Sequence, residues 1–337
     1  MRAVVVHGAG DLRVEELPNP VPGPGEVLIA VEFAGICGSD LSYWRHGATG
    51  TAVLKHPLVL GHEIAGRVAA LGPGVDGVEV GAAVTAHPAT PLGELPQRLA
   101  GRTNLVPTVR YWGSAMLDPH TDGAMCSFKV ARADQLRLLP DGVTTRLGAL
   151  AEPFAVALHA VSRLGDVQGR EVLVNGCGPV GALVVAALRF HGAGRVVAAD
   201  VAASSLAVAR AVGADVTLDL SAGAELPEDV ELVVEASGFP GALGGVLAAT
   251  ARGGRIVQVG NLPGTPSPAA LGQLVTREIT WTGSFRFVDE IDEAVRAFAA
   301  VDVSPVVTHE FDVEDAEEAM ATAADRSTGS SKVLVRF

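Results

Sequence analysis

The sequence predicts an α/β protein with a β-rich first part followed by a doubly wound parallel sheet. In the first 150 residues, short apolar runs are separated by glycine and proline turns. From about Thr144 onward, strands alternate with helices, which is typical of a parallel sheet with crossover connections. A glycine-rich turn also joins one of these strands directly to a helix. The length of 337 residues is enough for about two domains, and the mean hydropathy of +0.34 excludes a disordered chain.

Charge and composition limit the partners. Lysine and arginine number 25 and aspartate and glutamate 38, which gives a net charge of −13. A surface of this sign repels nucleic acid and anionic membranes, so we expect neither as a partner. No apolar run is long enough for a membrane span, and residues 2–6 predict a first strand and not a signal-peptide core. Three cysteines favour a reducing compartment, and the expected location is the cytoplasm.

The first domain is expected at residues 1–150 and is completed by residues 285–337. Its clearest strands are predicted at 26–36, 62–71 and 124–131. Residues 89–109 lack a clear period and predict a long loop. The returning segment predicts helices at 288–300 and 313–323 and strands at 306–310 and 332–336.

The second domain is expected at residues 151–284, where the spacing of apolar residues alternates between the period of a strand and that of a helix. Strands are predicted at 171–175, 195–199, 216–218, 231–235, 254–259 and 279–282. Helices are predicted at 146–164, 179–191, 203–212 and 241–250. We therefore expect a parallel sheet covered by helices, with a ligand site at the carboxyl ends of its strands.

The glycine-rich turn predicts a dinucleotide site. It follows the strand at 171–175 and contains Gly176, Gly178, Pro179, Val180 and Gly181. Gly176 permits the tight turn, Gly178 lets the backbone approach a pyrophosphate, and Gly181 allows close packing of helix on strand. The backbone N–H groups at the start of the helix then face the phosphates.

Asp200 ends the next strand and bears on the choice of cofactor. A carboxylate there accepts a hydrogen bond from the ribose 2′-hydroxyl and repels a 2′-phosphate, so the pattern predicts NAD over NADP. The alternative interpretation is an ordinary cap before the helix at 203–212.

Four residues could form a metal site. Cys37, His62, Glu63 and Glu152 offer a thiolate, an imidazole and two carboxylates, a set that binds Zn²⁺ if the side chains converge and leave one position open. Spacing alone does not establish convergence. Taken singly, Cys37 is more typical of a buried small hydrophobe, His62 of a structural histidine and Glu63 of a surface acid.

Longer motifs carry a family resemblance. Gly61-His62-Glu63 is followed by Gly66, Gly72, Val75 and Gly81. Together with the dinucleotide turn, this pattern resembles the zinc-dependent medium-chain dehydrogenases over essentially the whole chain. The resemblance implies a GroES-like, zinc-binding catalytic domain and a Rossmann dinucleotide-binding domain. Cys37-Gly38-Ser39-Asp40, Tyr43-Trp44 and Ala151-Glu152-Pro153 narrow it to the polyol branch, and residues 110–116, 119–123 and 283–287 to the L-idonate 5-dehydrogenases.

Several site roles follow only from this resemblance. It implies that Cys37, His62 and Glu63 are ligands of one catalytic zinc ion. Glu152 either ligates the zinc or holds a zinc-bound water, and Ser39 accepts the alcohol proton. The residues implied to meet or flank the substrate are Tyr43, Trp112, Ser114 and Arg286.

The resemblance also implies the reaction. Hydride passes from a secondary alcohol of a polyol or sugar acid to NAD, in a homodimer or homotetramer. Arg286 suits the carboxylate of a sugar acid, since a guanidinium group can bind it through two hydrogen bonds. A contact with a hydroxyl or backbone group is the alternative. Two rival hypotheses are a zinc-free quinone or enoyl reductase of the same superfamily and a non-catalytic NAD-binding protein.

Two departures from the family pattern matter. Many relatives bind a second, structural zinc through four cysteines, whose positions correspond here to Leu92, Leu95, Arg98 and Val106. We therefore expect no structural zinc and a segment that packs on apolar contacts. Ser42 stands where many relatives have a histidine that passes the proton to solvent, so proton release is expected by another route.

Overall fold

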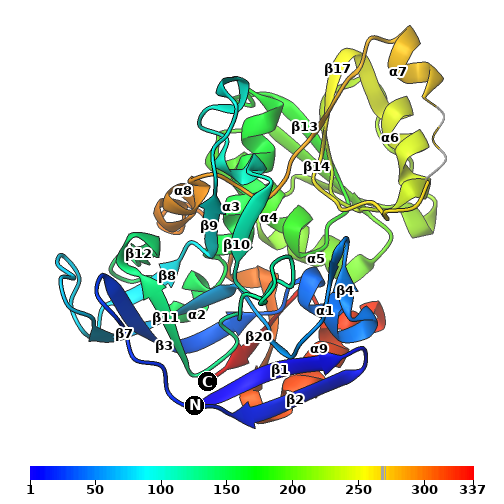
Figure 1. The fold of residues 1–337 in the computed structure, drawn as a ribbon. Helices are drawn as coiled ribbons and strands as arrows, with labels where there is room; N and C mark the ends of the chain where they lie inside the picture. The colour runs from blue at the N-terminus through cyan, green and yellow to red at the C-terminus, as the bar shows by residue number, and fades with distance from the viewer. Residues whose placement is uncertain (267–268, 270) are drawn as a thin grey trace. The chain divides into compact units, whose positions relative to one another are not determined.

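The computed structural model describes residues 1–266, 269 and 271–337, which form two compact units (Figure 1). The first unit comprises Met1–Glu152, Ala294–Ala299 and Val307–Phe337, and the second comprises Pro153–Glu293 and Ala300–Val306. The α/β class predicted from the sequence is confirmed. Among the described residues, no helix combines the length and apolar character needed to cross a membrane.

A seven-stranded, largely antiparallel sheet organises the first unit. The strands along its main path are, in order, β12 (Leu136–Leu138), β8 (Ala83–Ala86), β7 (Glu63–Leu71), β3 (Glu26–Gly35), β20 (Lys332–Arg336) and β19 (Val307–Asp312). The seventh strand, β11 (Phe128–Arg132), also pairs with β3. Gly35 at the end of β3 lies opposite both Glu63 of β7 and Leu334 of β20, so this point of the sheet joins segments far apart in the sequence.

Smaller elements complete the first unit. A second sheet has the order β2 (Asp11–Glu16), β1 (Arg2–Gly8) and β6 (Leu58–Val59), and a short hairpin pairs β4 (Ala48–Thr49) with β5 (Ala52–Val53). The helices are α1 (Gly38–His46), α2 (Thr145–Gly148) and α9 (Ala316–Ala324). Along β3, Val27, Ile29 and Val31 are buried and point into one core, as alternation along a strand requires.

Residues 89–109 are not the featureless loop that we expected. β9 (Ala89–Leu92) pairs with β10 (Thr108–Tyr111) as an antiparallel hairpin, with two 3₁₀ turns between them at Gln97–Leu99 and Thr103–Leu105. The sequence pattern did not indicate this pairing, because each strand is only four residues long and β9 contains a proline. Val106, Val109 and Tyr111 form a buried cluster with Ala89 and Leu95. Two positions that correspond to family cysteines, Leu95 and Val106, thus contribute apolar contacts.

The second unit contains a six-stranded parallel sheet (Figure 1). Its order is β15 (Val216–Asp219), β14 (Arg195–Asp200), β13 (Glu171–Asn175), β16 (Val230–Glu235), β17 (Thr250–Gln258) and β18 (Thr280–Gly283). The chain first proceeds outward from β13 to β15 and then outward from β16 to β18. The strand order therefore reverses between β13 and β16, and the crevice at their carboxyl ends is the expected ligand position.

Helices precede, connect and follow the strands of this sheet. They are α3 (Ala151–Leu164), α4 (Pro179–Phe190), α5 (Ala203–Ala211), α6 (Leu243–Ala249), α7 (Gly272–Thr276) and α8 (Glu290–Ala297), of which α3 and α8 each continue from one unit into the other. The helix expected at 146–164 is two helices, α2 and α3. Pro153 has no N–H to donate to Ala149, so one continuous helix would lack a hydrogen bond there.

The unit boundaries differ from the expected domains in three places. Residues 151–152 belong to the first unit and residues 300–306 to the second, and the longest difference is at residues 285–293. Residues 285–293 belong to the second unit, although we expected them to complete the first domain. Two histidines of the second unit hold this segment. The Nδ1 of His159 lies 2.6 Å from Oε1 of Glu290, and the Nε2 of His191 lies 3.3 Å from Oε1 of Glu293.

Candidate functional site

Three side chains that can bind a metal converge in the first unit. Cys37 is the N-cap residue of α1, His62 precedes β7, and Glu63 begins it. Ligand atoms of Cys37, His62 and Glu63 all lie within 4.8 Å of one another. The sequence could not establish this convergence, and the structure provides it.

Asp40 fixes the backbone beside two of these residues. Its side chain is fully buried, and its Oδ2 accepts the Cys37 N–H at 2.9 Å while its Oδ1 accepts the Gly61 N–H at 3.0 Å. Burial raises the pKa of Asp40, although the charge of His62 opposes this. Gly61 has a φ of 90°, which other residues rarely adopt, and a Cβ there would lie 2.8 Å from Cβ of Met125. This role of Asp40 was not predicted from the sequence.

A buried ammonium group holds Glu63. The Nζ of Lys332 donates to both carboxylate oxygens of Glu63 at 2.7 Å and to the carbonyl of Ile36 at 3.0 Å. Burial disfavours the charged amine, but the Glu63 and Cys37 charges outweigh this effect and raise the pKa of Lys332. Gly35 makes room for the carboxylate, since a Cβ there would lie 2.2 Å from Oε2 of Glu63. Lys332 was not predicted from the sequence, where its only signal is one lysine opening an apolar strand.

The polar atoms of this cluster suit a metal ion. The Nδ1 of His62 is buried and has no hydrogen-bond partner within the described part of the chain. Burial disfavours the protonated ring, but the charge and hydrogen bond of Cys37 and the charges of Asp40 and Glu152 raise the pKa of His62 to about 10. A thiolate, an imidazole and a carboxylate are donors that Zn²⁺ prefers, and three protein ligands leave a fourth position open. The residues therefore fit zinc.

Glu152 lies close to this cluster but outside the converging set. It is in the first turn of α3, and its Oε1 accepts a hydrogen bond from the Tyr111 hydroxyl at 2.6 Å. Burial raises the pKa of Glu152, with the charges of His62 and Glu63 acting in opposite directions. The geometry favours Glu63 over Glu152 as the third direct ligand.

The serines of α1 have different surroundings. Ser39 is half-buried in the first turn of the helix, two residues after Cys37. Ser42 donates its hydroxyl proton to the carbonyl of Ala48 at 2.6 Å. Because its proton is used there, Ser42 does not stand ready to pass a proton onward in place of the histidine of many relatives.

The residues expected near the substrate are mostly buried in the first unit. Tyr43 and Trp112 belong to the main core, and the Tyr43 hydroxyl accepts the Ala115 N–H at 2.9 Å. The half-buried Ser114 accepts the Met116 N–H through its hydroxyl at 3.3 Å. Tyr43 thus supports the segment that carries Ser114, and direct contact of these residues with a substrate stays a prediction.

Arg286 lies in the second unit, apart in the chain from the other predicted substrate residues. Its φ is 51°, in the left-handed region, and its guanidinium carbon lies 4.8 Å from the centre of the Phe285 ring. A non-glycine residue held in this conformation indicates a constrained turn.

The glycine-rich turn has the form that a dinucleotide site requires. Gly176 has a φ of 92°, and Pro179 opens α4 with Val180 beside it. A Cβ at Gly181 would lie 1.9 Å from the carbonyl oxygen of Gly176, whereas a Cβ at Gly178 would meet nothing within 4 Å. Gly181 is therefore required by packing, and Gly178 leaves open space over the start of the helix.

Asp200 is bonded to the glycine turn itself. Its Oδ2 accepts the Cys177 N–H at 2.6 Å, and its Oδ1 accepts the Ala202 N–H at 2.9 Å. The carboxylate thus stands at the end of β14 with a fixed orientation. It also caps the segment before α5, so the two interpretations of Asp200 are compatible.

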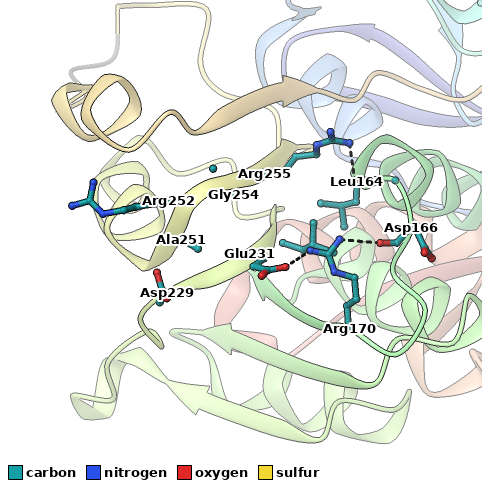
Figure 2. A pocket seen from close by; sticks show the side chains of 12 residues that line it. Leu164, Asp166, Arg170, Asp229, Glu231, Ala251, Arg252, Gly254 and Arg255 are labelled. Carbon is teal, nitrogen blue, oxygen red and sulfur yellow. Dashed lines mark hydrogen bonds and ion pairs between the residues drawn. The ribbon is translucent and has the colours of Figure 1, made fainter.

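A hollow lies at the amino ends of the strands of the parallel sheet (Figure 2). Its volume is about 640 Å³, and arginine and acidic side chains line it in equal number. Arg170 pairs with Glu231 and donates to the carbonyl of Asp166 at 3.3 Å, while Arg255 donates to the carbonyl of Leu164 at 2.9 Å. Because these charges balance, the hollow gives no indication of a charged ligand.

Comparison with known proteins supports the same conclusions. The family model of the alcohol dehydrogenase GroES-like domain matches residues 23–141, and that of zinc-binding dehydrogenases matches residues 179–300. Sorbitol dehydrogenase of Bos taurus is 38% identical over 335 residues, which cover 95% of this chain and 92% of that protein.

Solved structures are similar over the full length. L-idonate 5-dehydrogenase of Escherichia coli has a TM-score of 0.91 at 33% identity and covers 100% of this chain and 98% of its own. A protein of Sinorhizobium meliloti described as a zinc-binding dehydrogenase, bound to NADP, has a TM-score of 0.90 at 29% identity and covers 100% of this chain and 99% of its own. The GroES-like and Rossmann domains implied by the sequence resemblance are thereby confirmed, and the chain belongs to the zinc-dependent medium-chain alcohol and polyol dehydrogenases.

Proposed function

We propose that this protein oxidises a secondary alcohol of a polyol or sugar acid, with NAD as the hydride acceptor and one zinc ion per chain. The observation that carries the proposal is the convergence of Cys37, His62 and Glu63 within 4.8 Å. This convergence disfavours the zinc-free reductase, which has no use for such a donor set. It also disfavours a protein that only binds NAD.

Each residue of the first unit has a proposed task. Cys37, His62 and Glu63 would hold zinc, which supplies Lewis acidity toward the alcohol or ketone oxygen when bound. Ser39 would relay the alcohol proton outward, accepting it as its own hydroxyl proton leaves, and the hydrogen bond from Tyr111 keeps the Glu152 carboxylate in one orientation. The Asp40 and Lys332 contacts fix Cys37 and Glu63 before substrate arrives, so little reorganisation is needed during reaction.

The proposed preference for NAD rests on Asp200. Its carboxylate is fixed by two backbone N–H groups, and the residues that follow it are Val201, Ala202 and Ala203. A 2′-phosphate would face this negative charge without a cation in the adjoining segment. The relative of Sinorhizobium meliloti was solved with NADP, and kinetics with both cofactors test the preference of this chain.

The proposed substrate class rests on likeness and on Arg286. Similar proteins include sorbitol dehydrogenases and an L-idonate 5-dehydrogenase, which act on a polyol and a sugar acid by their names. If the substrate is a sugar acid, Arg286 would bind its carboxylate, and Arg286→Lys would raise KM for sugar acids more than for uncharged polyols.

A substrate panel with metal analysis tests the proposal. Purified protein is assayed with polyols and sugar acids, each with NAD⁺ and NADP⁺, and its zinc content is measured. We expect NAD⁺ reduction and about one zinc per chain. Cys37→Ser should lose both zinc and activity, while Cys126→Ser, at a buried cysteine outside the cluster, should keep them. An active Cys37→Ser protein would refute the zinc site.

A further inference from the structure

We infer that Glu235 is a positioning residue for the dinucleotide site and fixes the loop at residues 236–239 against the glycine turn. The inference rests on the proposed function, because the loop borders the turn that would bind the cofactor. Glu235 ends β16, at the point where the strand order of the parallel sheet reverses. No side chain identified above acts on this loop.

The Glu235 carboxylate is fully buried and receives hydrogen bonds from three residues. Its Oε2 accepts the Asn175 side-chain N–H at 2.6 Å. Its Oε1 accepts the backbone N–H of Ser237 at 2.8 Å, the Ser237 hydroxyl and the N–H of Gly238 at 3.2 Å. A buried carboxylate is costly unless such donors surround it. The network therefore holds the backbone of the loop in one conformation.

The loop packs tightly between two glycine turns. A Cβ on Gly176 would lie 2.3 Å from the backbone nitrogen of Ser237, and a Cβ on Gly260 would lie 2.3 Å from that of Gly238. On both sides, the backbone of the loop thus packs directly against another backbone segment, with no side chain between them. A shift of the loop would press on Gly176, the first residue of the dinucleotide turn, or open a gap beside it.

The network also reaches the surface. The Ser237 hydroxyl accepts the Phe239 N–H at 3.1 Å, and the Phe239 side chain is 64% exposed. One buried carboxylate is thus connected through Ser237 to an exposed aromatic residue at the carboxyl edge of the sheet. An exposed aromatic at this edge can pack against a cofactor only if the loop is held in place.

The opposite strand supplies a matched partner. Asn175 ends β13 and pairs with Glu235 in the register of the parallel sheet. In Glu235→Gln, the new amide would turn either its N–H₂ group toward the Asn175 donor or the same group toward the donors of the loop. Facing the loop, this group opposes the Ser237 and Gly238 donors. Facing Asn175, it is accommodated only if the Asn175 amide turns its oxygen inward, and a neutral acceptor then replaces the charged acceptor on the loop. The hydrogen bonds that hold the loop are therefore weakened in both cases.

The test measures cofactor binding in Glu235→Gln by titration with NADH and by steady-state kinetics. We expect the Kd for NADH and the KM for NAD⁺ to rise about tenfold, because neutral hydrogen bonds to the loop are weaker than those to a carboxylate, with kcat within about twofold of wild type. Zinc content should not change, because the zinc ligands lie in the first unit. Poor folding alone would lower kcat and the fraction of active protein, without the selective rise in Kd and KM.

Two further variants make the result specific. Asn175→Asp combined with Glu235→Gln exchanges donor and acceptor within the pair and turns the new amide oxygen toward the loop, so the double variant should recover part of the lost affinity. Glu231→Gln removes a carboxylate from the same strand, where the side chain is 68% exposed and pairs with Arg170, and should bind NADH as wild type does.

The outcomes separate this inference from the proposed function. A wild-type protein that binds neither NADH nor NADPH overturns both. Normal binding by wild type with unchanged binding by Glu235→Gln overturns the inference alone. If Glu235→Gln does not fold, Ser237→Ala carries the test, since it removes one donor to Glu235 and the acceptor for Phe239. A Kd raised about threefold in that variant supports the inference, and an unchanged Kd overturns it.

Discussion

Lys332 shows how a single residue can set the behaviour of the metal cluster. Its ammonium group, only 4% exposed, faces the 1% exposed Glu63 carboxylate. Removing one partner of a buried ion pair typically costs about 3–5 kcal/mol, because the other charge stays buried without a counterion. A cation that takes the place of the ammonium group should restore part of the lost stability.

Lys332→Met should therefore destabilise the metal-free protein more than the zinc-loaded protein. Zinc would neutralise the carboxylate that the lysine has left, so added zinc should raise the Tm of the variant by a larger step than that of wild type. Thermal unfolding of chelated protein with and without zinc measures the two steps. Lys129→Met, which alters an amine outside the cluster, is the control, and equal steps in all three proteins would contradict the prediction.

The three cysteines should differ in their reactivity toward alkylating reagents, because they differ in burial. Burial raises the pKa of Cys126 to about 11, and burial also raises the pKa of Cys177, so neither is a thiolate at pH 8. Cys37 is only half-buried. We expect one thiol per chain to react in metal-free protein and none after zinc is added, as counted by alkylation and mass spectrometry. Labelling of Cys37 that zinc does not change would count against the site.

At the scale of elements, two glycines at the start of α4 should have different roles, one in cofactor binding and the other in packing. Gly178→Ala should leave Tm within about one degree of wild type, since its Cβ meets nothing within 4 Å. It should still weaken NADH binding about tenfold or more, because the pyrophosphate must approach that backbone. Gly181→Ala should lower Tm by several degrees, since its Cβ would lie 1.9 Å from the Gly176 carbonyl oxygen. Calorimetry and NADH titration of both variants check the contrast.

The contact between α3 and α8 should depend on pH. Burial raises the pKa of Glu290, but the hydrogen bond and charge of His159 outweigh it and hold the pKa of that carboxyl below its usual range. A carboxylate with a depressed pKa stabilises the fold above its unfolded pKa, and this contribution is lost as the pH falls through the folded pKa.

Glu290→Gln should therefore lower Tm at pH 6 by several degrees, and the difference from wild type should shrink below about pH 4. Unfolding curves across this pH range measure it. Glu293→Gln, on the same helix and paired with His191 at 3.3 Å, should show a smaller difference. A constant difference for Glu290→Gln at all pH values would disprove the linkage.

Predictions from the sequence succeeded where periodicity or motif spacing was strong. The strand at 171–175 and the strand at 332–336 have the bounds that we expected. The short strands of the hairpin at 89–111 were missed, because four residues carry too little alternation to detect. Lys332 and Glu235 were missed for a different reason. Each is a charged residue at one end of an apolar strand, and only the other strands of its sheet show that it is buried and paired.

At the scale of the whole molecule, the two proposed ligands belong to separate units. The converging metal ligands lie in the first unit, and the glycine turn with Asp200 lies in the second. Chelation should therefore lower thermal stability and abolish turnover while leaving the Kd for NADH within about threefold of its original value. Titration of chelated and zinc-restored protein measures this, and loss of NADH binding on chelation would contradict it.

The pairing of Lys332 with Glu63 also has a consequence for biosynthesis. The two residues are 269 positions apart in the chain, and the lysine on β20 is synthesised long after Cys37, His62 and Glu63. A nascent polypeptide that already carries Cys37, His62 and Glu63 still lacks the ammonium group that neutralises the carboxylate. If translation stalls before β20, the three metal ligands would carry excess negative charge and would be accessible to whichever divalent ions are present in the cell.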